Sequence, residues 1–111
     1  MPFLTIYTNS DVKDDSIVVD AAQLVATQLS KPIRYVVVNI INNSNMAFDG
    51  AKENKGALLE MKSIGFGNKQ LLAQSLTNLI AEKMQVNKNL VNIEFVDMPA
   101  NTVAIGGNLL G

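Results

Sequence analysis

The apolar positions of the chain change period along its first half. A β-favouring run at 2–8 is followed by apolar residues at i, i+3 and i+4 spacing over 17–29. A run rich in β-branched residues follows at 35–41. Proline disfavours helical backbone at the residue before it, so the helix ends at Ser30-Lys31-Pro32. This half therefore predicts a strand, a helix and a buried strand.

The second half repeats this order. An apolar run at 57–64 predicts a strand, and a helical stripe of apolar residues spans 71–84. Apolar and polar residues alternate over 91–96, which is typical of a half-buried strand.

We therefore expect one domain over 1–111 with an internal pseudo-repeat. The repeat joins about 1–45 with about 56–98, and a glycine-rich tail follows at 99–111. The predicted fold class is α/β: two β-α-β units form a four-stranded mixed sheet with two helices on one face. The other face stays bare although its strands are apolar on both sides. A bare apolar face predicts a homo-oligomer, and short tail strands could add to a neighbour's sheet edge.

The charge and hydropathy of the chain limit the classes of binding partner and the locations that we expect for the protein. Nine basic and ten acidic residues give a net charge of -1 with no basic stripe, so we expect no nucleic-acid partner. The apolar runs are about seven residues long, too short to span a membrane. The start of the chain lacks the basic segment of a signal peptide. We expect a cytoplasmic protein, and export without a signal peptide stays open.

The chain contains no cysteine and no histidine. Thiol nucleophiles, serine–histidine–acid triads and histidine-containing zinc sites are therefore excluded. A near-neutral proton carrier would have to be a shifted carboxylate, a shifted lysine or the α-amine. Among these, only the α-amine has an ordinary pKa close to neutrality, at about 7.7 to 8.0.

Five short motifs stand in this order along the chain: Met1-Pro2-Phe3, Ser30-Lys31-Pro32, Asn45-Met46-Ala47-Phe48-Asp49-Gly50, Lys62-Ser63-Ile64-Gly65 and Phe95-Val96-Asp97-Met98. In these motifs and their order, essentially the whole chain resembles the macrophage migration inhibitory factor family of the tautomerase superfamily.

The resemblance implies a homotrimer with active sites between subunits. It also implies keto–enol tautomerisation of a 2-oxo acid such as phenylpyruvate, with dopachrome-type isomerisation as a side activity. No metal or organic cofactor is needed. The Pro2 nitrogen would be the general base and acid once Met1 is removed. Lys31 would bind the carboxylate or carbonyl oxygen, and the Ile64 backbone N–H would donate a hydrogen bond.

Pro2 also has a plain interpretation, because proline commonly follows an initiator methionine. The catalytic interpretation is chemically coherent. Beside Phe3, Val103 and Ile105 a free secondary amine would be partly desolvated, which lowers its pKa. If Met1 remains, the nitrogen is a tertiary amide without basicity.

Some positions depart from the family pattern. Asn92 and Glu94 stand where the family has a tyrosine and an asparagine contributed by a neighbouring subunit. Glu94 would oppose an anionic substrate unless Lys62 or Lys31 pairs with it. Ile105 replaces an aromatic residue, so the pocket loses stacking surface.

Two other functions remain open. One is a cytokine-like interaction protein with a receptor partner and weak or no catalysis. The other is a cofactor-free module that binds a non-aromatic ligand. Ser63 could be considered a nucleophile, but no supporting constellation accompanies it. The predicted substrate-binding set is Phe3, Lys31, Lys62, Ser63, Ile64, Asn92, Glu94, Val103 and Ile105.

Overall fold

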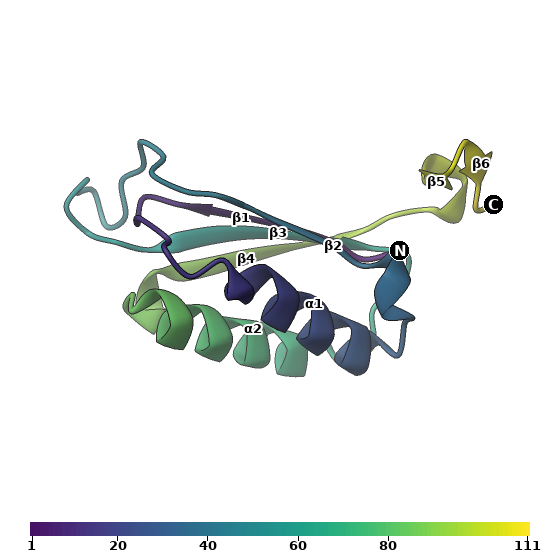
Figure 1. Cartoon of the computed structure of the whole chain (residues 1–111), viewed down its shortest axis with the longest axis horizontal. Coiled ribbons are helices and arrows are strands. Elements are labelled where there is room, and N and C mark those ends of the chain that lie inside the picture. The colour runs from purple at the N-terminus through teal and green to yellow at the C-terminus, as the bar shows by residue number, and fades with distance from the viewer.

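A computed structural model describes all residues 1–111, and it shows a four-stranded sheet with two helices on one face (Figure 1). The sheet has the order β2-β1-β3-β4. The main elements are β1 (Phe3–Thr8), α1 (Ser16–Leu29), β2 (Val37–Ile41), β3 (Ala57–Ser63), α2 (Lys69–Met84) and β4 (Val91–Asp97). The tail carries a two-stranded hairpin of β5 (Ala104–Ile105) and β6 (Asn108–Leu109). Single-turn 3-10 helices are η1 (Ile33–Tyr35), η2 (Lys88–Leu90) and η3 (Ala100–Thr102).

The strand pairing confirms the predicted mixed sheet. β1 and β2 are parallel, as are β3 and β4, and each pair is connected through a helix. The two units meet where β1 and β3 run antiparallel. The α/β fold predicted from the sequence is therefore correct.

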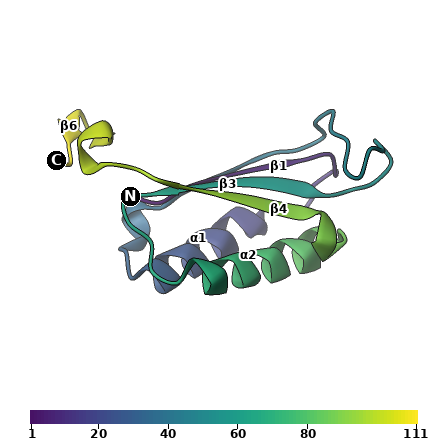
Figure 2. The same cartoon turned by 180° about the vertical axis from the view of Figure 1, so that it is seen from behind.

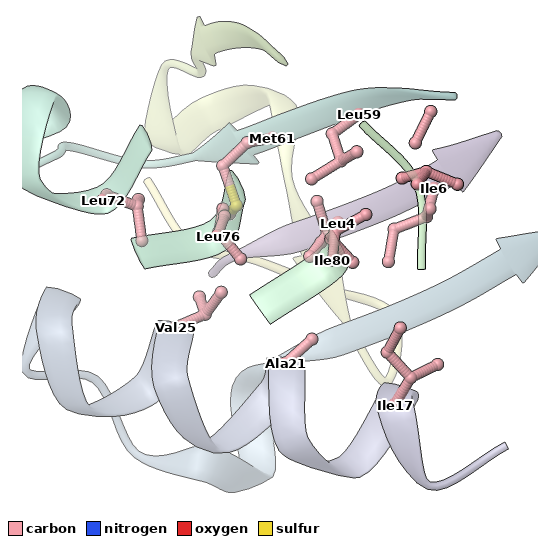
Figure 3. Packing of buried hydrophobic residues seen from close by; sticks show 12 residues of the cluster. Leu4, Ile6, Ile17, Ala21, Val25, Leu59, Met61, Leu72, Leu76 and Ile80 are labelled. Carbon is pink, nitrogen blue, oxygen red and sulfur yellow. The ribbon is translucent and has the colours of Figure 1, made fainter. Parts of the chain in front are cut away.

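One layer of apolar side chains fills the space between the sheet and the helices (Figure 3). Each helix buries a stripe at helical spacing, and alternate residues of the central strands point into the same layer. The residues labelled in this layer are Leu4, Ile6, Ile17, Ala21, Val25, Leu59, Met61, Leu72, Leu76 and Ile80. No helix is both long and apolar enough to cross a membrane.

The prediction of a buried strand over 35–41 is wrong in two respects. The chain forms η1 after Pro32, with the Tyr35 N–H donating to the Pro32 carbonyl at 3.0 Å, so the strand begins only at Val37. β2 is also an edge strand, and Val37 is 53% exposed. The β-branched side chains of this edge strand therefore point to both faces of the sheet, and some of them stay exposed in the protomer.

The sheet face away from the helices is uncovered, as predicted (Figure 2). It is not uniformly apolar, which corrects the expectation from sequence. The strand register arranges this open face in three rows: Val37, Phe3, Lys62 and Val96, then Asn39, Thr5, Glu60 and Glu94, then Ile41, Tyr7, Leu58 and Asn92. The middle row is polar throughout, so only the flanking rows offer apolar area for a partner.

Candidate active site

Pro2 lies immediately before β1 and is fully buried. Its carbonyl accepts a hydrogen bond from the Val37 N–H at 3.0 Å, which fixes the start of the chain to β2. Phe3 pairs with Lys62, so this start lies at the sheet end where β3 closes with Ser63. The strand pairing thus positions Pro2 at one end of the sheet.

The α-amine of the chain, carried here by Met1, has a pKa below its ordinary value of 8.0. Partial burial is the larger cause, because desolvation disfavours the charged form. The positive charge of Lys31 is the second cause. Both causes favour the uncharged form of an amine at the start of the chain.

Lys31 reaches this place because of how α1 ends. Ser30 adopts the left-handed conformation at φ 54°, and the Lys31 N–H donates to the Ala26 carbonyl at 3.0 Å. The Lys31 ammonium then donates to the carbonyl of Ile64 at 3.4 Å. The helix end and the turn after β3 are thereby joined by one side chain.

The turn after β3 exposes a backbone donor. The Ile64 N–H makes no hydrogen bond within the protomer, and the next N–H, that of Gly65, donates to Asp97 Oδ1 at 2.9 Å. Gly65 has a φ of +79°, a conformation that L side chains rarely adopt. Asp97 therefore holds the turn in place, a role that sequence analysis did not assign to it.

Ser63 is fully buried, and its hydroxyl oxygen has no hydrogen-bond partner. Its backbone carbonyl accepts from the Met98 N–H at 2.8 Å, which ties the ends of β3 and β4 together. No base contacts the hydroxyl. The structure gives Ser63 no arrangement that would activate a nucleophile.

The protomer does not bring all predicted residues together. Lys62 and Phe3 share the first row of the open face with Val96. At about 3.3 Å per residue, Glu94 lies about 7 Å and Asn92 about 13 Å further along β4. Neither Lys62 nor Lys31 forms an ion pair within the protomer, where the ion pairs are Lys13–Asp11 and Lys83–Asp20.

The two predicted tail residues belong to a separate small unit. Val103 is 4% exposed, and its carbonyl accepts from the Leu110 N–H at 2.9 Å. Ile105 lies in β5 and is 37% exposed. The tail stands apart from the helical layer, beyond the sheet end that holds the N-terminus (Figures 1 and 2). Any contact of Ile105 with Pro2 stays a prediction.

In the isolated protomer, Pro2, Lys31 and Ile64 form a cluster, here called the N-terminal cluster, that lies outside any surface cavity. None of the four surface hollows is lined by these residues. The arrangement supplies a buried amine position, a nearby cation and a free backbone donor on one side only. A reactant bound here would need further walls.

Comparison with known proteins gives one consistent family. The family profile for Macrophage migration inhibitory factor (MIF) matches residues 1–111. A macrophage migration inhibitory factor homolog of Brugia malayi is 33% identical over the full length of both chains. The homolog of Wuchereria bancrofti is 31% identical, also over both full lengths.

Solved structures agree with this result. The macrophage migration inhibitory factor of Trichinella spiralis has a TM-score of 0.90 at 26% identity, covering 96% of this chain and 98% of that one. The Prochlorococcus marinus homologue has a TM-score of 0.92 at 24% identity, covering 98% and 99%, and it shows the shared fold. On the profile, the relatives and the fold, the chain belongs to the macrophage migration inhibitory factor family.

Proposed function

We propose that this protein is a keto–enol tautomerase that acts on 2-oxo acids such as phenylpyruvate, with the Pro2 nitrogen as general base and acid. The observation that carries the proposal is the lowered pKa of the α-amine beside Lys31. Removal of Met1 would transfer the amine to Pro2, which is more deeply buried than Met1. The same burial and the same lysine charge would lower the pKa of a secondary amine there, which favours the neutral form that acts as a base.

The reaction needs one proton to move between carbon and oxygen of the substrate. Pro2 takes the proton from the carbon next to the carbonyl, and negative charge develops on the carbonyl oxygen. The protonated amine then returns the proton to that oxygen, which gives the enol. Ketonisation runs through the same steps in reverse, and the amine ends each cycle neutral.

Two groups of the N-terminal cluster, the Lys31 ammonium and the Ile64 N–H, are suited to stabilise the developing negative charge. The Lys31 ammonium has only a long hydrogen bond of 3.4 Å to the Ile64 carbonyl, so it can turn toward a substrate carboxylate. The Ile64 N–H lacks a partner within the protomer and can donate to an oxygen. A fixed backbone donor such as the Ile64 N–H stabilises an oxyanion without reorganising during the reaction.

A homotrimer would supply the missing walls. The open sheet face, the exposed edge strand β2 and the projecting tail support self-association. Members of this family are typically oligomeric. In a trimer, Asn92, Glu94 and Ile105 would reach the N-terminal cluster of a neighbouring copy. This assembly is part of the proposal.

An ultraviolet assay of phenylpyruvate ketonisation tests the activity. Wild type, Pro2→Gly and Tyr7→Phe are compared after mass spectrometry confirms that each chain has lost Met1. Tyr7 is the matched control because it lies in β1, the strand that begins directly after Pro2, at the far end of the open face. We expect kcat/KM to fall about 100-fold or more in Pro2→Gly and to be unchanged in Tyr7→Phe. Equal rates for wild type and Pro2→Gly would refute the proposal.

A second candidate is an interaction protein with weak or no catalysis. The observation that favours it is the pairing of Glu60 with Glu94 on the open face, with no ion pair to offset the two carboxylates. If a neighbouring copy contributes these two carboxylates to the wall of the pocket, their negative charges disfavour the binding of an anionic substrate. If Pro2→Gly binds a receptor protein as wild type does while ketonisation is absent from both, the interaction function is supported instead.

A further inference from the structure

A long connection joins β2 to β3 at the sheet end opposite the N-terminus (Figure 1). The buried side chain of Asn9 holds this connection. Its Nδ2 donates to the Asn54 carbonyl at 2.8 Å and to the Met46 carbonyl at 3.4 Å. Its Oδ1 accepts from the Gly56 N–H at 3.1 Å. One amide group thus ties both limbs of the connection to the end of β1.

Further side chain to backbone bonds hold the same segment. The Thr8 hydroxyl donates to the Gly56 carbonyl at 2.6 Å, and Asn54 Nδ2 donates to the Phe48 carbonyl at 2.8 Å. A side chain at Gly56 would meet the Leu90 carbonyl oxygen at 2.5 Å, so the close approach there requires glycine. The connection is therefore a preformed structure, as ligand sites usually are.

Residues of this segment line a surface cavity of about 540 Å³ that is open to solvent. That volume lies within the range of small-molecule sites, about 300 to 1,000 Å³. Only two of the eight lining residues are apolar, and the polar ones are Asn9, Asn43, Ser44, Asn45, Lys52 and Lys55. Amides and a hydroxyl can both donate and accept hydrogen bonds.

The lining carries two positive charges and no negative one. Lys52 has neither an ion pair nor a hydrogen bond within the chain, and Lys55 donates only to the Asn9 carbonyl, at 3.2 Å. Asp49 and Glu53 belong to the same connection but do not line the cavity. Two ammonium groups without carboxylate partners create a local positive potential, although the whole chain has a net charge of -1.

We propose that this cavity binds a small molecule that bears a phosphate monoester. Two lysine charges match the charge of a phosphate monoester, which is about −2 near neutral pH, better than the single charge of a carboxylate. The asparagine amides and Ser44 suit the hydroxyl groups of the attached carbon skeleton. The site is separate from the proposed active site, because β1 places about 20 Å of strand between Pro2 and Asn9.

The test uses glycerol 3-phosphate as the probe, followed by backbone amide chemical shifts, with glycerol and acetate as control ligands. The protein variants are Lys52→Gln with Lys55→Gln together, and Lys88→Gln as a matched exposed lysine in a different hollow. Glutamine keeps a donor at residue 55, so the bond to Asn9 can survive. We expect saturable shifts confined to residues 43–56 and neighbouring Asn9, and affinity at least about tenfold weaker in the double variant. Lys88→Gln should bind as wild type does.

Three results would each overturn the proposal. The first is an absence of saturable shifts in the 43–56 connection. The second is equal affinity in wild type and in the double variant, since the two charges would then play no part. The third is equal binding of acetate or glycerol, since the phosphate would then not be what the cavity recognises. None of these readouts depends on tautomerase activity.

Discussion

The Lys31 ammonium donates to the Ile64 carbonyl at 3.4 Å, and this contact joins the end of α1 to the turn after β3. It places a cation between the start of the chain and a backbone N–H that has no other partner. The same lysine therefore acts on the α-amine through its charge and is within reach of an incoming anion. Variants of the contact separate these two effects.

Lys31→Met is expected to raise the pKa of the α-amine toward 8.0, because a like charge that disfavours the protonated form is removed. Burial still acts, so the pKa should stay below 8.0. The sign can be read by NMR titration of the amine. Lys69→Met is the control, since Lys69 lies over Phe66 and does not contribute to the shift. A lower pKa in Lys31→Met would contradict the assigned cause.

Asp97 is expected to matter for catalysis although it is exposed. Asp97→Ala removes the acceptor of the Gly65 N–H and frees the turn that presents the Ile64 N–H. We expect kcat/KM to fall about tenfold, which corresponds to one lost hydrogen bond of about 1 to 1.5 kcal/mol. Asp97→Asn keeps an oxygen acceptor and should retain most of the activity. Equal activity in Asp97→Ala and wild type would show that the turn does not depend on this bond.

Ser30→Gly is expected to stabilise the protein by about 1 kcal/mol. Ser30 adopts a left-handed conformation at the end of α1, where glycine has no steric penalty. Thr27→Gly, one turn earlier inside the helix, should destabilise by about 0.3 kcal/mol, because threonine is already a poorer helix former than alanine. Urea unfolding of the two variants therefore gives opposite signs, and a loss of stability in Ser30→Gly would contradict the account of the helix end.

The Glu60 and Glu94 carboxylates should repel each other across the β3–β4 pair. Like charges on neighbouring strands repel each other and solvent screens the exposed pair, so Glu60→Gln and Glu94→Gln should each raise the free energy of unfolding by roughly a few tenths of a kcal/mol. The double variant should gain less than the sum, because the first substitution already removes the repulsion. Strict additivity in denaturant unfolding would indicate that the two side chains do not interact.

Local patterns were enough to predict the helices, the central strands and the two-unit architecture. Apolar spacing identified the stripes of α1 and α2, and Pro32 marked the end of the first helix. Residue type misled at Tyr35 and Val36, which are β-favouring but lie within and directly after a 3-10 turn, ahead of the strand. Turn formation there depends on a local hydrogen bond, which β-propensity does not report.

Contacts in the site between residues far apart in the sequence could not be predicted from the pattern of apolar and polar residues. The Gly65–Asp97 hydrogen bond spans 32 positions, and the opposition of Glu60 to Glu94 follows from strand register. No local signal encodes either one. The absence of histidine and cysteine did direct attention to the α-amine, whose part in catalysis stays a prediction.

The state of the N-terminus tests the central claim most directly. One preparation is divided, and one part is treated with methionine aminopeptidase until intact-mass spectrometry shows complete loss of Met1. Phenylpyruvate ketonisation is then measured in parallel. Activity should rise in proportion to the fraction of chains that begin at Pro2, because the nitrogen is a non-basic amide while Met1 is attached. Equal activity in the chains that keep Met1 would contradict this claim.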